Sequence, residues 1–144
     1  IGAEAQKANI AVSIHAPYYI NSANLEKLEN NIAYLMDAAR AVKLMGGGRV
    51  VFHPGSPSRM KRDAALQTSL ETVALARKRL DDAGYADILL CPETMGRPSQ
   101  LGTLDEIIAL YHDRGALFDA MNADSGNATG VDNVLAQIYK YAKK

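Results

Sequence analysis

The stretch Ile10-Ala-Val-Ser-Ile-His15-Ala-Pro17 is an apolar run that stops at a histidine followed closely by a proline. The same arrangement returns at Val50-Val-Phe-His53-Pro54, and a related one at Ile88-Leu-Leu-Cys-Pro92-Glu93, where the metal-capable group is a carboxylate. His53 follows His15 by 38 residues and Glu93 follows His53 by 40, roughly the length of one strand, one helix and two loops. This spacing predicts three parallel strands whose carboxyl ends bring the three side chains to one edge of a sheet.

Helical patterns fill the intervals between these runs. Apolar residues recur with helical spacing between residues 25 and 42 and between residues 66 and 80, and glycines follow each pattern. Thr103 and Glu106 have the Thr-x-x-Glu spacing of a capping box, which predicts a short helix after them. The alternation predicts an α/β fold of repeated βα units with parallel strands, about half of a TIM (β/α)8 barrel. We expect one partial barrel domain over residues 1–144, with strands near residues 10–14, 49–52, 86–90 and 116–118.

The composition sets limits on the partners and the compartment. Sixteen basic residues balance sixteen acidic ones in a chain of 144, so no global charge draws the protein to nucleic acid or to an anionic membrane. The single cysteine, Cys91, has no partner for an internal disulfide, which indicates a reducing compartment and makes the cytoplasm the expected location. No apolar run has the length of a membrane span. The chain begins without methionine, and we expect it to be a piece of something longer.

The metal-capable residues are more informative together than singly. A lone histidine after a strand is more often a structural residue than a ligand, but two of the three histidines, His15 and His53, occupy equivalent positions with Glu93 in register. Two imidazoles and a carboxylate are ligand types of zinc and similar divalent ions. Three protein ligands leave one coordination position open, which is typical of catalytic zinc. A carboxylate can also bridge two ions, so a site with several metals is open as well.

Three motifs resemble the endonuclease IV type of apurinic/apyrimidinic endonuclease, a zinc-dependent TIM-barrel family of DNA-repair nucleases. They are His15-Ala-Pro-Tyr-Tyr-Ile-Asn21, Val51-Phe-His-Pro-Gly-Ser56 and Leu90-Cys-Pro-Glu-Thr-Met-Gly96, and they arrive in the order and spacing of that family. The resemblance covers about residues 10 to 110. It implies hydrolysis of the phosphodiester on the 5′ side of abasic sites in double-stranded DNA, as part of base excision repair, with up to three zinc ions.

The resemblance also implies roles for particular residues. His15 and His53 would hold one zinc, and Glu93 would bridge it to a second ion and act as the catalytic carboxylate. Asp119 would be a ligand of the second ion, although Asn122 stands where the family has a histidine, and an amide is a much weaker zinc ligand than imidazole. Family members draw further ligands from later strands, for which no residues remain in this chain. Activity of this chain alone is therefore an open question.

Contacts with DNA follow from the same resemblance and from charge. Tyr18 matches a position from which the family inserts a side chain into DNA, and packing on the rim is the alternative. Basic residues near the predicted metal end can contact phosphates or simply be solvated; they are Arg59, Lys61, Arg62 and Arg97. Cys91 is expected to fill apolar space rather than bind zinc, and His112 is expected at the surface.

Two other classes of function are consistent with the sequence. The chain could be a half-barrel module without catalytic power that keeps a partial metal site and self-associates through open sheet edges. Related barrels also place histidine and glutamate at strand ends to bind metals for sugar isomerisation or epimerisation, although the motifs around His53 and Glu93 are closer to the nuclease.

Overall fold

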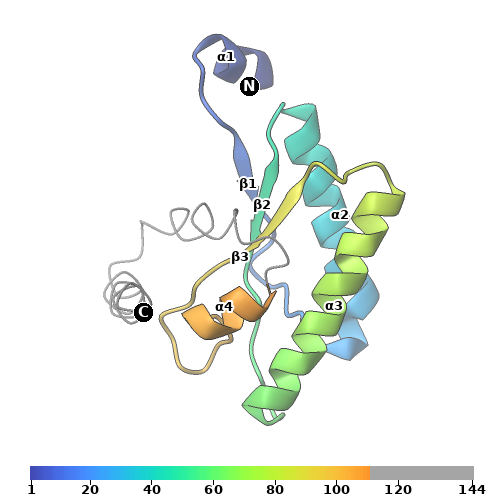
Figure 1. Cartoon of the computed structure of the whole chain (residues 1–144), viewed down its shortest axis with the longest axis vertical. Helices are drawn as coiled ribbons and strands as arrows, with labels where there is room; N and C mark the ends of the chain where they lie inside the picture. Colours follow the sequence, from blue (N-terminus) through green and yellow to red (C-terminus); the bar gives the residue numbers. More distant parts are fainter. Residues whose placement is uncertain (111–144) are drawn as a thin grey trace.

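The architecture is that of a computed structural model, which describes residues 1–110. Figure 1 shows three strands side by side in one sheet, in the order β1-β2-β3: β1 (Ser13–His15), β2 (Arg49–Phe52) and β3 (Leu89–Pro92). Both pairings are parallel, with Ser13 opposite Arg49 and Arg49 opposite Leu89. The prediction of repeated βα units with parallel strands is confirmed.

Two long helices cover one face of this sheet. They are α2 (Leu28–Leu44) and α3 (Arg62–Asp82), and in Figure 1 both lie on the same side of the strands. Side chains alternate between the two faces of a strand, and Val50, Phe52 and Leu90 point toward the helices, where they join one core cluster with Leu35 and Leu80. The opposite face carries Val51 and Cys91, which form a separate buried cluster. The strands that lead to His15, His53 and Glu93 are thus supported from the helical side.

Two strands differ in extent from the prediction. β1 begins at Ser13 instead of residue 10, because its partner strand β2 begins only at Arg49. The three glycines before Arg49 are not part of a strand, so residues 10–12 have no strand to pair with. β3 covers Leu89–Pro92 instead of residues 86–90, because the N–H of Ile88 bonds to the carbonyl of Tyr85 in a turn. Apolar character alone does not show where pairing starts.

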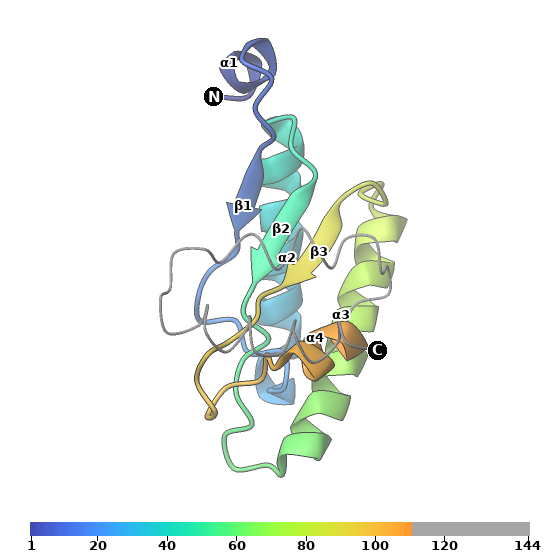
Figure 2. The same ribbon diagram turned by 60° about the vertical axis from the view of Figure 1, so that its left-hand side comes forward.

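Shorter helices complete the described part of the chain. A 3-10 turn, η1 (Leu25–Lys27), leads into α2, and α4 (Leu104–Leu110) follows β3 and lies near the carboxyl ends of the strands (Figure 2). The predicted capping box is confirmed: the N–H of Glu106 donates to Thr103 Oγ1 at 3.3 Å, and the N–H of Thr103 donates to Glu106 Oε2 at 2.9 Å. The strand predicted near 116–118 lies outside the described residues.

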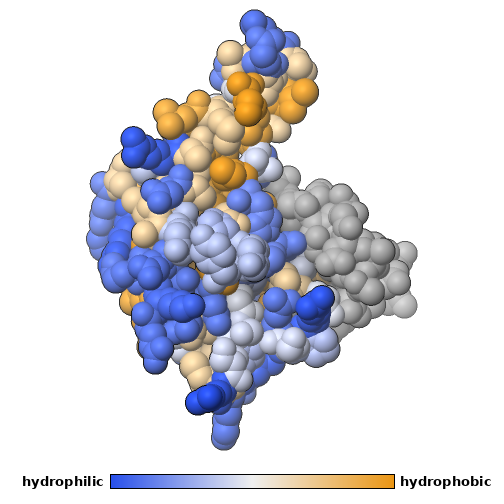
Figure 3. Space-filling view, turned by 180° about the vertical axis from the view of Figure 1, so that it is seen from behind, coloured by the Kyte–Doolittle hydropathy of each residue, from blue (hydrophilic) through white to orange (hydrophobic). Residues whose placement is uncertain are grey.

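The first helix, α1 (Gly2–Lys7), projects from the amino ends of the strands and has no buried residue. Ile1 and Ile10 on either side of it are exposed, and Figure 3 shows apolar residues gathered in this part of the surface. No helix within residues 1–110 has both the length and the apolar character needed to cross a membrane.

Candidate metal centre

The three predicted ligands meet at the carboxyl edge of the sheet. His15 is the last residue of β1, His53 follows β2, and Glu93 follows β3. The parallel pairing continues past the strand ends, because the N–H of Ala16 donates to the carbonyl of Val51 at 2.7 Å and the N–H of Glu93 donates to that of Phe52 at 2.9 Å. This continued pairing fixes the backbone beside each ligand and places the three side chains on the sheet face that α2 and α3 leave uncovered.

One carboxylate oxygen lies between the two imidazoles. Glu93 Oε2 is 2.8 Å from Nε2 of His15 and 2.9 Å from Nε2 of His53, and the two rings meet edge to face with centroids 4.9 Å apart. One ligand atom from each of the three residues lies within 4.8 Å of the others. The predicted convergence of His15, His53 and Glu93 is therefore present, and together they can hold a metal ion.

The contacts of His15 show that the cluster suits a cation. Its Nδ1 lies 2.6 Å from the carbonyl oxygen of Ala16, which only accepts, while its Nε2 faces the carboxylate of Glu93. A neutral imidazole has one N–H, so an Nδ1–H donated to Ala16 leaves a lone pair on Nε2 directed at a second electron-rich atom. A positive charge between Nε2 of His15 and Oε2 of Glu93, carried by a proton or by a metal ion, stabilises this arrangement. The donor set fits a divalent ion of the zinc type.

Burial and charge make Glu93 an anionic partner for that ion. The residue is only 8% exposed. Burial alone would raise the pKa of its carboxyl, but the hydrogen bonds from His53 and His15 outweigh that effect and lower the pKa from 4.5 to about 2. The imidazoles are more open, since the side chain of His15 is 43% exposed and that of His53 is 22% exposed. Solvent or a substrate can therefore approach from the histidine side.

The tyrosines that follow His15 take two different positions. Tyr18 is 77% exposed and lies edge to face with Tyr19, at 5.5 Å between ring centroids. Tyr19 in turn contacts Tyr34 of α2, at 5.2 Å. The contact with Tyr34 anchors Tyr19 on the protein, whereas Tyr18, in the loop that follows His15, stays largely exposed.

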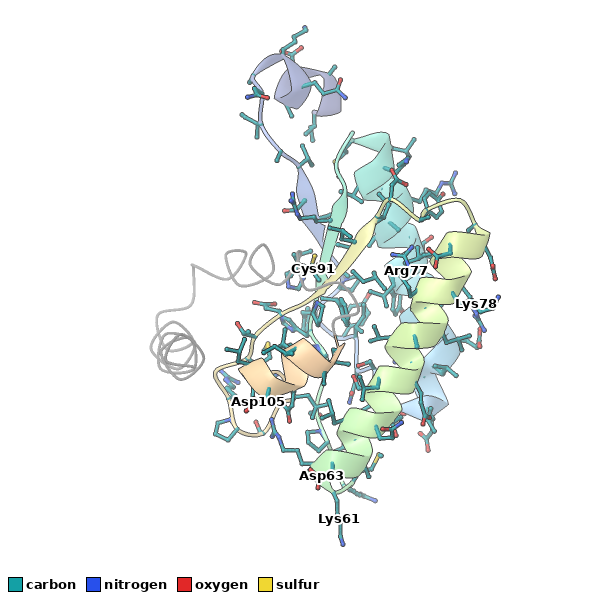
Figure 4. The ribbon with its side chains drawn as sticks, viewed as in Figure 1. Lys61, Asp63, Arg77, Lys78, Cys91 and Asp105 are labelled. Carbon is teal, nitrogen blue, oxygen red and sulfur yellow. The ribbon has the colours of Figure 1, made fainter. Side chains whose placement is uncertain are left out.

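The basic residues predicted near the metal end have different surroundings. Arg59 and Arg97 are exposed, and Arg59 lines an open pocket of about 380 Å³ together with Leu25 and Met60. Lys61, at the start of α3, projects away from the body of the protein (Figure 4). Arg62 is different: its guanidinium donates to Glu106 and to the carbonyls of Pro98 and Gln100 at 2.6–2.9 Å. These bonds use four of the five N–H groups of Arg62, which favours a structural role for this residue over a contact with phosphate.

Cys91 lies on β3 beside the centre (Figure 4) and is 1% exposed, packed with Val51 and Leu89. Its environment is that of the apolar filler that we expected. Asp119, Asn122 and His112 lie outside the described residues.

Sequence reasoning missed the side chains that tie the ligand-bearing loops together. Asn21, in the loop after β1, bonds through its side chain to the backbone of Ser56, in the loop after β2. Asn31 of α2, which is 2% exposed, bonds to the backbone of Asn21. The available signal was weak: an asparagine in a loop normally indicates a local turn rather than a contact 35 residues away.

Known proteins resemble this chain in sequence and in fold. The uncharacterized protein MJ0133 of Methanocaldococcus jannaschii is 31% identical over 142 residues, which cover 94% of this chain and 50% of that protein. The probable endonuclease 4 of Mycoplasmopsis agalactiae is 27% identical over 103 residues, which cover 70% of this chain and 35% of that protein. A solved structure, that of a D-tagatose 3-epimerase-like protein, superimposes with a TM-score of 0.62 at 19% identity, covering 78% of this chain and 44% of that one.

The three comparisons agree on the fold and differ in the names of the proteins. At 19% identity, the epimerase-like structure shows a shared fold alone. The chain spans half or less of the length of each of these three proteins. The sequence pattern of xylose isomerase-like TIM barrels matches residues 1–142, nearly the whole chain. The parallel sheet with its covering helices is thus part of such a barrel, and the chain belongs to the xylose isomerase-like TIM barrel family.

Proposed function

We propose that this chain carries the first metal site of a zinc-dependent endonuclease that hydrolyses the phosphodiester 5′ to abasic sites in DNA. The observation that carries the proposal is the convergence of His15, His53 and Glu93 within 4.8 Å at the carboxyl edge of the sheet. That edge is where barrels of this kind place their chemistry. The motifs around the three residues resemble the endonuclease IV type, and a 27% identical relative is named probable endonuclease 4.

In this proposal each residue of the centre has a defined task. His15 and His53 present Nε2 to the ion, and the Nδ1–H of His15 stays on the carbonyl of Ala16, which fixes the ring and its tautomer. Glu93 supplies a carboxylate that is ionised at neutral pH and acts as the catalytic and bridging group. Asp119 is proposed as a ligand of a second ion. A bound divalent ion supplies charge stabilisation for the phosphate oxygens during hydrolysis.

Binding of DNA is assigned to exposed groups on the same edge. Tyr18 has a largely exposed ring that can stack on a base or fill the space at a lesion. Arg59 and Arg97 are exposed cations in the loops after β2 and β3, where they can contact the phosphate backbone. Because the net charge of the chain is zero, such local contacts carry the attraction to DNA.

The test combines metal analysis with cleavage. The purified 144-residue protein is loaded with zinc, dialysed and assayed on a duplex with one abasic site, beside its His53→Ala and Glu26→Gln variants. Glu26 is an exposed carboxylate of η1, so its variant controls for a general loss of acidic groups. We expect the wild type and Glu26→Gln to retain zinc and to nick the DNA on the 5′ side, and His53→Ala to lose both. Equal zinc content and equal cleavage in all three proteins would contradict the proposal.

A sugar isomerase or epimerase activity is the second candidate. It rests on the same three ligands, since imidazoles and a carboxylate at strand ends can also hold a metal next to a sugar. The two candidates separate when the same zinc-loaded proteins receive ketohexoses in place of DNA. The epimerase would be favoured if the wild type converts a sugar, the His53→Ala variant does not, and neither protein nicks abasic DNA.

A further inference from the structure

We propose that Asn21 is the positioning residue of the metal centre: its side-chain amide holds the loop after His15 against the loop after His53. The inference rests on the metal site of the proposed function and adds a residue that contacts neither metal nor substrate. Asn21 lies six residues after His15, while Ser56, its partner, lies three residues after His53. A link between these two points fixes the separation of the loops that follow the two imidazoles.

The link uses both ends of the amide. Asn21 Oδ1 accepts hydrogen bonds from the N–H of Ser56 at 3.2 Å and from the N–H of Ala23 at 3.1 Å. Asn21 Nδ2 donates to the carbonyl of Ser56 at 3.3 Å. Ser56 is therefore held through its N–H and its carbonyl, in the way that a neighbouring strand would hold it. Only a side chain with an acceptor and a donor on one planar group can make this pair of bonds.

The backbone of Asn21 is itself held by a side chain of helix α2. Nδ2 of Asn31 donates to the carbonyl of Asn21 at 2.7 Å, and Oδ1 of Asn31 accepts from its N–H at 3.4 Å. The next residue, Ser22, is fully buried, and both its N–H and its hydroxyl donate to the carbonyl of Pro54, at 3.1 and 2.6 Å. Pro54 follows His53 directly. The backbone of this segment is thus fixed between α2 and the loop that carries the second imidazole.

Gly55 shows how closely the two loops approach. Its φ of 100° lies in the region that favours glycine, and a Cβ at this position would lie 2.2 Å from Oδ1 of Asn21. Only a residue without a side chain allows the amide of Asn21 to reach Ser56. The carbonyl of Gly55 accepts from the N–H of Leu101 at 2.9 Å, so the loop after Glu93 is tied to the same point.

All three ligand-bearing loops therefore meet around one amide. Without it, Ser56 loses both of its bonds to the loop after His15. The bonds from Ser22 to Pro54 are then left to join the two loops, and the separation of the imidazoles is fixed less tightly. Loss of groups that orient metal ligands typically lowers metal affinity by about 10- to 100-fold. We expect a loss of this size when the amide of Asn21 is removed.

The test is a titration of the metal-free 144-residue protein with cobalt(II), whose visible absorption bands report the geometry of the ligands. The variants are Asn21→Ala, Asn21→Asp and, as matched controls in the same loop, Asn24→Ala and Asn24→Asp. Among residues 1–110, the side chain of Asn24 accepts only from the nearby N–H of Glu26, so its removal leaves the link between loops intact. Thermal unfolding followed by far-UV circular dichroism identifies a temperature at which all of the titrated variants are folded, and the titrations are done at that temperature.

We expect Asn24→Ala to match the wild type and Asn21→Ala to bind cobalt about 10- to 100-fold more weakly with altered bands. Asn21→Asp keeps the acceptor and loses the donor to Ser56, so it should lie between these two. A folded Asn21→Ala protein with the affinity and bands of the wild type overturns the inference.

Two further outcomes are also decisive. If Asn21→Ala does not fold, the comparison passes to Asn21→Asp and Asn24→Asp, which carry the same added charge, and equal cobalt binding by these two overturns the inference. If the wild type binds no more cobalt than His53→Ala, the metal site of the proposed function fails and the role of Asn21 falls with it.

Discussion

Glu93 is the residue on which the proposed centre depends most. Its Oε2 contacts both imidazoles, and it is the most buried of the three groups. The lowered pKa of its carboxyl means that the negative charge is already present before any ion arrives. A metal would therefore find a preformed anionic position between two imidazoles and would not need to displace a proton from the carboxyl group.

Replacing that charge by a neutral isostere should remove metal binding while keeping the fold. We expect Glu93→Gln to weaken zinc binding by more than about 100-fold, because even residues outside the ligand set contribute 10- to 100-fold. Competition with a chromophoric chelator measures this. Glu26→Gln, at an exposed position, should bind zinc like the wild type. Retention of zinc by Glu93→Gln would show that the carboxylate is not a ligand.

At the residue scale, sequence could identify the metal-capable residues but not the side chains that support them. His15, His53 and Glu93 could be predicted from the sequence because each ends an apolar run and because the runs recur at a nearly constant interval. The role of Asn21 depends on the conformation of Gly55 and on the backbone of Ser56, which no local pattern encodes. The bonds of Arg62 could not be predicted for a similar reason, since its acceptors lie 36 to 44 residues away.

At the scale of elements, the order of strands and helices followed from periodicity, whereas strand ends did not. The capping box at Thr103 could be predicted from the sequence because its two bonds join residues only three positions apart. The ion pair of Glu106 with Arg62 could not be predicted from the sequence, because the two residues are 44 positions apart. The guanidinium of Arg62, at the start of α3, bonds to this carboxylate and to two carbonyls of the loop before α4. These contacts join the end of the β3 loop to the helix layer.

Removal of the guanidinium should therefore destabilise the protein. Arg62→Ala leaves the carboxylate of Glu106, which is 6% exposed, without this cation, and we expect a loss of about 1–3 kcal/mol in the free energy of unfolding. Urea denaturation measures it. Arg79→Ala is the matched control, because Arg79 pairs with Glu29 at the surface, and this variant should change stability far less. Equal effects of the two substitutions would contradict the role assigned to Arg62.

The same carboxylate predicts a dependence of stability on pH. Burial alone would raise the pKa of Glu106, but bonds from Arg62, Gly102 and Thr103 lower it below the ordinary 4.5. The folded protein thus binds this proton more weakly than the unfolded chain. Its contribution to stability is complete above pH 4.5 and is lost as the pH falls through the lower folded pKa.

Urea unfolding of the wild type and of Glu106→Gln across this range isolates the effect. The difference in unfolding free energy between the two proteins should be largest above pH 4.5 and should shrink in acid. A difference that does not change with pH would mean that the charge of Glu106 does not stabilise the fold.

At the scale of the whole molecule, the described part is a parallel sheet with helices on one face. Within residues 1–110, β1 and β3 are the outer strands of the sheet, and open edges of this kind invite further strands. A non-catalytic half barrel that self-associates through these edges remains a proposal, which light scattering after size-exclusion chromatography tests. Sequence predicted the barrel class because the βα repeat is regular. The part of the site assigned to Asp119 depends on residues outside the described range.

Removal of metal should lower the stability of the whole fold. A ligand that binds only the folded state at 100 times its dissociation constant adds about 2.7 kcal/mol to the free energy of unfolding. We therefore expect EDTA to lower the unfolding temperature of the zinc-loaded protein by several degrees. His53→Ala should show no such change, and an equal response of the two proteins to EDTA would place any bound zinc elsewhere.

The most direct measurement is anomalous diffraction at the zinc absorption edge from crystals of the zinc-loaded protein. The account predicts one strong peak within bonding distance of His15 Nε2, His53 Nε2 and Glu93 Oε2, and no peak at Cys91. The absence of zinc between these three side chains, or a peak at the cysteine sulfur instead, would contradict it.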